Sequence, residues 1–299
     1  MKKTEPLNLL DPHFLSKIGN LELISRAVVE GFITGLHKSP FHGFSVEFSQ
    51  HRPYMTGDSL RFVDWKVYAR TDRFYIKQFE EETNLRSYLL LDTSKSMDFT
   101  SHKITKWQYA TYLAAGLSYL LLQQRDATGL VLFDEAVKLH MRPRSIRSYL
   151  KQIINQIENA QLGNDTQIAV ALHQIAKQFR RRGLVILISD LLDDPHSVLK
   201  GLKHFRHDQH EVIVFQILDR QEVEFNFKGN VLFKDLENEE KIKTQPYLIK
   251  EQYRNRMQQF LKVYQLETSK NNIEYQLLFT DEPLTVALTK FLSKRKRLF

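Results

Sequence analysis

The stretch SYLLLDTSKSM, residues 87–97, joins an apolar run to a polar segment in which Asp92, Ser94 and Ser96 stand at alternate positions. The leucine run is typical of a strand that is buried on both faces of a sheet. From this strand toward the C-terminus, apolar strand-like runs alternate with amphipathic helical ones. Such alternation predicts an α/β fold, in which a mostly parallel sheet is covered by helices on both faces.

The spacing of apolar residues predicts the individual elements of this alternation. Buried strands are expected at 87–92, 183–190, 211–219 and 273–280, with a hairpin near 128–143. Helices are expected near 20–37, 103–125, 145–160, 168–179, 196–208 and 250–268, and after the last strand. We therefore divide the chain into an N-terminal helical and then β-rich segment, 1–86, packed on a main domain, 87–299, with a β-hairpin insertion near 220–250.

Composition narrows the classes of protein to which the chain can belong. The 299 residues contain no cysteine, which excludes disulfides, thiolate zinc sites and cysteine nucleophiles. No apolar run approaches the roughly 20 residues that span a bilayer, and the start of the chain does not resemble a signal peptide, so a cytoplasmic protein is expected. The net charge of +8 suggests an acidic partner, a nucleic acid or an anionic membrane, but the basic residues are scattered, and solvated helix ends are the simpler interpretation of them.

Polar residues follow two of the predicted strands, and these residues form the candidate site. Asp92, Ser94 and Ser96 follow the first strand, and Asp190 ends the strand at 183–190. The helix that begins near Thr166 precedes that second strand and runs antiparallel to it, so its N-terminus is expected at the same edge of the sheet. Asn164 and Asp165 are equally suited to cap this helix.

Two carboxylates and three hydroxyls form an all-oxygen site, which hard cations prefer. We therefore expect Mg²⁺, or Mn²⁺ or Ca²⁺, to bind Asp92, Ser94, Ser96, Thr166 and Asp190. Because serine and threonine are neutral, such a cation retains an affinity for one more anionic ligand. An Asp or Glu of another protein would supply it.

The segments DTSKSM, GNDTQIAVAL and LISD resemble the three parts of the metal-ion-dependent adhesion site of von Willebrand factor A-type domains. Upstream, RPYMTGDSLRFVDWKVYAR, residues 52–70, resembles the hallmark of the bacterial family called domain of unknown function fifty-eight. In that hallmark we single out Arg52, Tyr54, Gly57, Asp58, Arg61, Asp64, Trp65 and Arg70. One departure from the common adhesion-site form is Asp98, where a glycine often stands; its carboxylate either tunes the site or faces solvent.

The resemblance implies a von Willebrand A-like, Rossmann-like domain in a protein that often works with a MoxR-type AAA+ ATPase, in a chaperone or assembly role. It implies no established enzymatic activity. Our leading hypothesis is thus a metal-dependent protein-interaction module.

Two further hypotheses remain open. One is a Mg²⁺-dependent phosphohydrolase with Asp92 as nucleophile, although Ser94 stands where such enzymes usually need a second carboxylate. The other is nucleic-acid binding through FRRRG, residues 179–183, and the basic tail at 293–299. For residues 52–70, we expect the charged side chains to have a structural role, because no catalytic nucleophile paired with a general base is evident there.

Overall fold

The structure is a computed structural model that describes residues 10–37, 51–54, 65–77, 85–163, 167–179, 181–227, 231–234 and 241–296. Its main sheet has six strands: β3 (Arg86–Asp92), β4 (Ala127–Phe133), β5 (Val137–Arg144), β6 (Leu184–Ser189), β7 (Glu211–Leu218) and β10 (Glu274–Phe279). Their order is β10-β7-β6-β3-β4-β5, and only the pair β4 and β5 is antiparallel. The predicted α/β class with a mostly parallel sheet is confirmed.

The strand order reverses between β3 and β6. Counted along the chain, the sheet has the order 3-2-1-4-5-6 of doubly wound α/β proteins. In such sheets the connections leave in opposite directions at the reversal, so ligands bind beyond the carboxyl ends of the two strands there. We call the end of the sheet formed by the C-terminal ends of its parallel strands the carboxyl edge.

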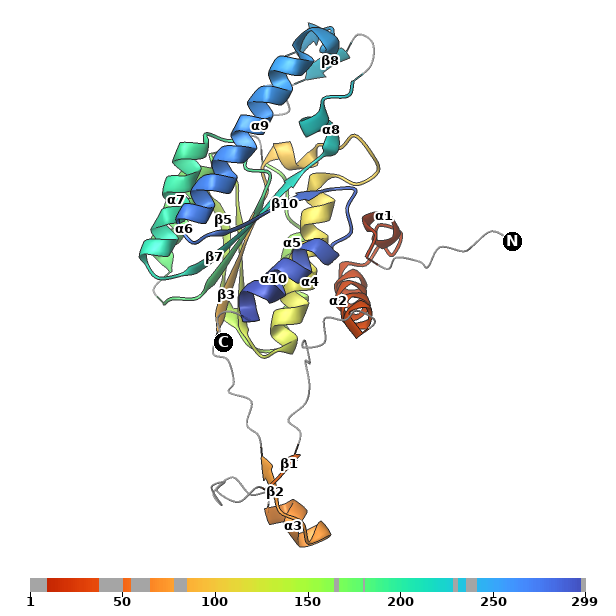
Figure 1. The fold of residues 1–299 in the computed structure, drawn as a ribbon, viewed down its shortest axis with the longest axis vertical. Coiled ribbons are helices and arrows are strands. Elements are labelled where there is room, and N and C mark those ends of the chain that lie inside the picture. The colour runs from red at the N-terminus through yellow and green to blue at the C-terminus, as the bar shows by residue number, and fades with distance from the viewer. Residues whose placement is uncertain are drawn as a thin grey trace, which may run out of the picture.

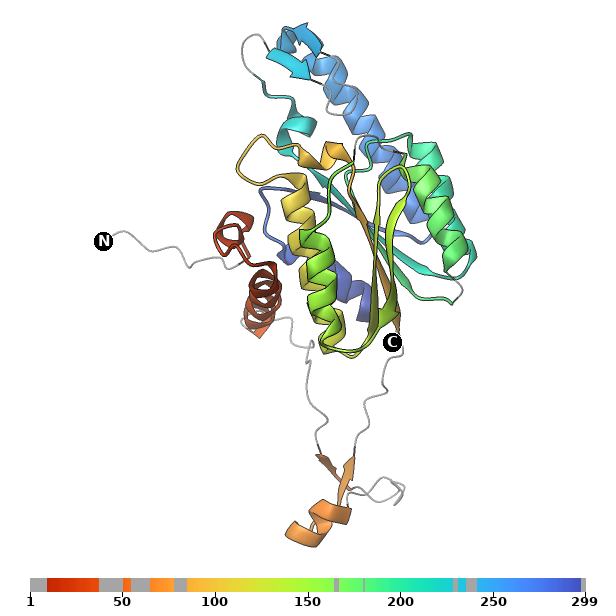
Figure 2. The same ribbon diagram turned by 180° about the vertical axis from the view of Figure 1, so that it is seen from behind.

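Helices cover both faces of this sheet (Figure 1 and Figure 2). One face carries α2 (Leu21–His37), α4 (Lys106–Gln123), α5 (Tyr149–Glu158) and α10 (Thr285–Lys296). The other carries α6 (Ile168–Gln178), α7 (Pro195–His207) and α9 (Pro246–Lys270). Strand β3 therefore buries Leu89 and Leu91 in one core and Tyr88 and Leu90 in the other, which explains its unbroken apolar run.

The N-terminal helix α2 packs on α4, and a short helix α1 (Pro12–Leu15) precedes it. One side of α2 is buried in the same core as the sheet, through Leu21, Ile24, Val28, Val29 and Phe32. The spacing of these residues is that of an amphipathic helix. Helix α2 thus completes the layer of helices on that face.

A small group, described here by itself, combines strands β1 (His51–Pro53) and β2 (Tyr75–Lys77) with helix α3 (Trp65–Thr71). The rings of Tyr68 and Phe74 stack with centroids 4.3 Å apart, and Trp65 meets both edge-on. Tyr54 lies beside Phe74, at 6.1 Å. Two hallmark residues, Tyr54 and Trp65, thus join the hairpin to α3, whereas Gly57, Asp58, Arg61 and Asp64 lie outside the described residues.

A second antiparallel hairpin consists of β8 (Val231–Lys234) and β9 (Lys241–Thr244), between the short helix α8 (Arg220–Glu224) and α9. The first half of α9 and this hairpin project beyond the carboxyl edge of the main sheet (Figure 1). Of the helices in the described ranges, none has the length and apolar character that crossing a membrane requires.

Candidate functional site

The carboxyl edge brings the ends of β3 and β6 together. The two strands pair in parallel with Leu91 beside Ile188, so Asp92 and Ser189 are the next residues of the two strands. The Ser189 hydroxyl donates to Oδ2 of Asp92 at 2.5 Å, and both side chains are buried. Asp190 follows Ser189 directly, and the two predicted carboxylates therefore come from adjacent strand ends.

The turn after β3 gathers the serine oxygens at this point. Oδ1 of Asp92 accepts the backbone N–H of Ser94 at 2.8 Å, a local bond that explains why the chain turns here without a glycine. The hydroxyl oxygens of Ser94 and Ser96 lie 3.0 Å apart at the start of the short 3-10 helix η2 (Lys95–Asp98). Asp98, at the end of η2, is exposed.

Residue 163 brings a third segment to the same turn. The backbone N–H of Gly163 donates to the carbonyl oxygen of Thr93 at 2.7 Å. Thr93 is itself fixed to the end of β4, since its N–H and its hydroxyl both donate to the carbonyl of Phe133. Thr166 lies outside the described residues, as do Asn164 and Asp165, but the segment that leads to them touches the turn after Asp92.

The turn after β6 fixes the backbone of Asp190. Leu191 adopts a left-handed conformation, φ 55°, which a leucine keeps only where its surroundings enforce it. Here the N–H of Leu191 donates to Ser189, and its carbonyl accepts the hydroxyl of Tyr264 at 3.1 Å. The Gln216 amide donates to the Asp190 carbonyl at 2.7 Å. Three hydrogen bonds thus hold this turn in one orientation.

A buried lysine that the sequence analysis missed reaches the same edge. Lys106, the first residue of α4, has no exposed surface, and its Nζ lies 2.8 Å from Oδ2 of Asp190 and 2.6 Å from Oε1 of Glu222. A signal was present in the sequence, because Lys106 is in helical register with the core residues Ala110, Leu113 and Leu117. A lysine on the buried side of a helix requires a buried anion.

The segment after the neighbouring strand β7 contributes two more acids, also missed in the sequence analysis. Asp219, which follows β7, caps α8, and the Glu222 side chain accepts the Asp219 N–H at 2.8 Å. Asp219 also binds Ser101 of the loop before α4, through the N–H at 2.8 Å and the hydroxyl at 2.5 Å. The spacing Asp219-x-x-Glu222 is a capping box that the sequence displays.

The electrostatics of this edge are unbalanced. Asp92, Asp190 and Glu222 each carry one negative charge when ionised, while Lys106 supplies one positive charge. Asp92 accepts hydrogen bonds from neutral donors, the N–H of Ser94 and the hydroxyl of Ser189. Burial, together with the charge of Asp190, raises the pKa of the Asp92 carboxyl to about 7. Among the residues that the structure describes, no basic side chain forms an ion pair with Asp92.

This donor set fits a hard divalent cation. Asp92, Ser94 and Ser96 present carboxylate and hydroxyl oxygens, which Mg²⁺ and Ca²⁺ prefer. The ionised form of the Asp92 carboxyl would also be stabilised by a cation. Across the described part of the chain, no three His, Asp or Glu side chains gather as a metal-binding cluster. A cation here would therefore depend on the serine hydroxyls, as the sequence analysis expected.

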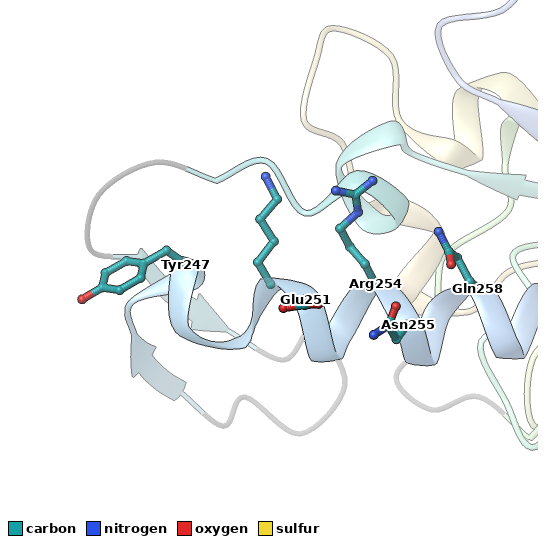
Figure 3. Close-up of a pocket in the computed structure, with 6 residues that line it drawn as sticks. Tyr247, Glu251, Arg254, Asn255 and Gln258 are labelled. Atoms are coloured by element: carbon teal, nitrogen blue, oxygen red, sulfur yellow. The ribbon is translucent and has the colours of Figure 1, made fainter.

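A separate hollow lies on the first turns of α9. Figure 3 shows its lining, which comes from one side of this helix: Tyr247, Lys250, Glu251, Arg254, Asn255 and Gln258. It is open to solvent, and the ammonium of Lys250 donates to Asn226 at its rim. It contains none of the predicted site residues, so the candidate site is the carboxyl edge.

Solved structures with a similar arrangement include BatB from Bacteroides thetaiotaomicron, which is 14% identical, with 71% of this chain and 99% of that chain covered, at a TM-score of 0.48. An aerotolerance-related membrane protein from Bacteroides fragilis is 14% identical over 72% of this chain and 100% of the other, at 0.47. The SpRpn10 VWA domain is 11% identical over 69% and 94%, at 0.40. Such values describe similarity only.

Relatives by sequence include uncharacterized proteins of Mycobacterium bovis and Mycobacterium tuberculosis. Each is 28% identical over 231 residues, which cover 76% of this chain and 72% of the relative. The profile of the family described as "Protein of unknown function DUF58" matches residues 50–264, which include Asp92, Lys106, Asp190 and Glu222. The chain therefore belongs to the DUF58 family.

Proposed function

We propose that this protein is an interaction module that binds a divalent cation at its carboxyl edge and engages a carboxylate of a partner protein. Its ligands would be Asp92, Ser94 and Ser96, with Thr166 and Asp190 completing the predicted set. Mg²⁺ is the expected ion, with Mn²⁺ or Ca²⁺ as substitutes. In this proposal the protein performs no catalysis.

The observation that carries the proposal is the buried Asp92 carboxylate, next to two serine hydroxyls 3.0 Å apart. Its neighbour Asp190 raises the free energy of the ionised form, and its hydrogen-bond donors are neutral. A cation at this position would reverse the penalty, because opposite charges attract strongly where water is excluded. The reversal of strand order between β3 and β6 is also where doubly wound folds bind ligands.

The two serine hydroxyls carry no charge, so they would not compensate the positive charge of a bound cation. The cation would therefore accept an acidic side chain of a partner as a further ligand, at an open position. The chain's own residues would orient that position. The Asp92 carboxylate accepts the Ser94 N–H, which fixes the turn, and the Gly163 N–H donates to the Thr93 carbonyl, which fixes the position of residue 163 beside it. Recognition would then need little rearrangement of the edge, which favours affinity.

The partner that the family resemblance suggests is a MoxR-type AAA+ ATPase, and we propose that the chain presents its carboxyl edge to an acidic loop of such an enzyme. The first half of α9 projects beside this edge (Figure 1), and its Tyr247 and Leu248 are exposed. These two apolar side chains would add contact area beyond the edge, near the start of the projecting helix.

Calorimetric titration with MgCl₂, MnCl₂ and CaCl₂ tests the cation site. We expect Asp92→Asn and Ser96→Ala to weaken binding at least about tenfold, because the first removes the negative charge of a ligand and the second removes a hydroxyl ligand. Asp208→Asn is the matched control, since this exposed carboxylate lies at the far end of α7 and should leave binding unchanged. Equal affinities in all these variants would refute the cation site.

A pull-down of the candidate ATPase, with and without EDTA, tests the interaction. Loss of capture in EDTA and in Ser96→Ala would support a metal-bridged contact, and capture that ignores both would refute it. Phosphatase activity that is abolished in Asp92→Asn would instead support the hydrolase hypothesis.

A further inference from the structure

Lys106 has the most unusual environment of the charged side chains described above. It has no solvent-exposed surface, and its ammonium is shared between Asp190 on β6 and Glu222 on α8. With one carboxylate oxygen at 2.8 Å and another at 2.6 Å, the ammonium forms an ion pair with each of these two acids. A buried charge of this kind is expensive and persists where it has a specific counterpart.

The lysine joins three elements of the carboxyl edge. Lys106 is the first residue of α4. Its partner Asp190 follows β6, and its partner Glu222 lies on α8 and also accepts the backbone N–H of Asp219. Asp219 in turn accepts hydrogen bonds from Ser101 of the loop before α4. Hydrogen bonds therefore connect α4 to α8, and Asp219 connects α8 back to the loop that precedes α4. This network lies at the same edge as the turn that carries Asp92.

The same network occupies one of the predicted metal ligands. Oδ2 of Asp190 faces the ammonium at 2.8 Å, and Oδ1 accepts the N–H of Leu192 at 3.2 Å. Asp92, by contrast, faces neutral donors. The two carboxylates of the predicted site are therefore not equivalent. Asp190 pairs with the ammonium of Lys106, whereas in the described part of the chain Asp92 pairs with neutral donors only.

We propose that Lys106 is a positioning residue that acts as a built-in counter-ion, competing with a divalent cation for Asp190. In the cation-free protein it neutralises Asp190 and Glu222, so the edge stays folded. A divalent cation would be held by Asp92, Ser94 and Ser96, and the ammonium would weaken this binding by repelling the cation and by pairing with Asp190. This inference rests on the cation site proposed above.

Competition predicts an opposite effect on stability and on affinity when the lysine is removed. Lys106→Met keeps the apolar stem but leaves Asp190 and Glu222 buried without a cation. In EDTA we expect a clearly lower melting temperature than that of the wild type. With MgCl₂ or MnCl₂ we expect a larger thermal shift than in the wild type, and a calorimetric affinity at least about tenfold higher.

Two further variants separate competition from a general loss of structure. Lys106→Met/Glu222→Gln removes one positive and one negative charge together. In EDTA it should have a higher melting temperature than Lys106→Met, and it should still bind the cation more tightly than the wild type. Lys103→Met removes an exposed charge three residues away, and it should leave the affinity within about twofold of the wild-type value.

The results distinguish this inference from the function on which it rests. Wild-type binding with equal or weaker binding in both Lys106 variants would overturn the inference alone. Binding by the Lys106 variants, with none by the wild type, would support the inference and refute the proposed function. No binding by any of these proteins would refute both.

Discussion

Whether helix α2 is an integral part of the main domain can be decided by two adjacent residues of equal size. Ile24 is 3% exposed and belongs to the core shared with α4, whereas Leu23 is 53% exposed. Both side chains have four carbon atoms, and both residues lie in the first turn of α2. A substitution to alanine therefore removes the same number of carbon atoms from a buried and from an exposed position.

We expect Ile24→Ala to lower the free energy of unfolding by about 2–5 kcal/mol, the range for large aliphatic residues truncated in a close-packed core. In a chain of this size, each kcal/mol lowers the melting temperature by about 2–4 °C, so a fall of roughly 4–20 °C is expected. Leu23→Ala should stay within about 0.5 kcal/mol of the wild type, because its side chain is largely in water already.

Thermal unfolding followed by circular dichroism measures both variants against the wild type. The packing of α2 on α4 predicts a single cooperative transition that shifts in Ile24→Ala. The reasoning would be refuted by two variants of equal stability, or by an early separate transition for α2 that leaves the main transition unmoved.

Three other perturbations have definite expected outcomes. A Cβ at Gly163 would lie 1.9 Å from Oδ2 of Asp134, so Gly163→Ala should displace the loop that meets the turn after Asp92, lower the melting temperature and weaken any cation binding measured by calorimetry. Gly183→Ala should be more destabilising still, because its Cβ would lie 2.2 Å from the backbone oxygen of Arg86, which cannot rotate away; recovery of folded protein at wild-type stability would contradict this. The buried His210 accepts the N–H of Gly183 through Nδ1, and burial lowers the pKa of His210, so the folded protein resists protonating it. Its contribution to stability is therefore complete above about pH 6.5 and is lost as the pH falls below that value, by at most about 1.4 kcal/mol per pH unit. Denaturant unfolding between pH 7.5 and 5.5 should show a flatter pH dependence in His210→Asn than in the wild type, and identical slopes would exclude this role.

Much of the candidate site could be predicted because its residues follow strands that are easy to recognise. Asp92 and Asp190 end apolar runs, and parallel strands bring their ends to one edge whatever the intervening chain does. Ser94 and Ser96 follow by covalent connection. The hydrogen bond from Ser189 to Asp92 shows how close the two strand ends lie.

The part that sequence reasoning missed depends on contacts between distant segments. Lys106, Asp190 and Glu222 are separated by 84 and 116 residues along the chain, counted from the lysine. Asp190 and Glu222 are ordinary residues in their own segments, a strand-end acid and the last acid of a capping box, and only the lysine, on the buried side of a helix, is unusual locally. Nothing local specifies that one ammonium bridges the two carboxylates.

The sequence by itself determined the alternation of strands and helices, the doubly covered sheet and the polar turn after β3, because hydrophobic periodicity and turn chemistry are local properties. Tertiary structure decided which charges meet. Strand order places β6 beside β3 and β7 beside β6, and the chain after β7 brings Glu222 of α8 to the start of α4. Lys106 therefore neutralises Asp190 and Glu222, while Asp92 retains neutral partners. Buried electrostatics depend on distances of a few ångströms across the fold, and these are fixed only when the whole sheet is assembled.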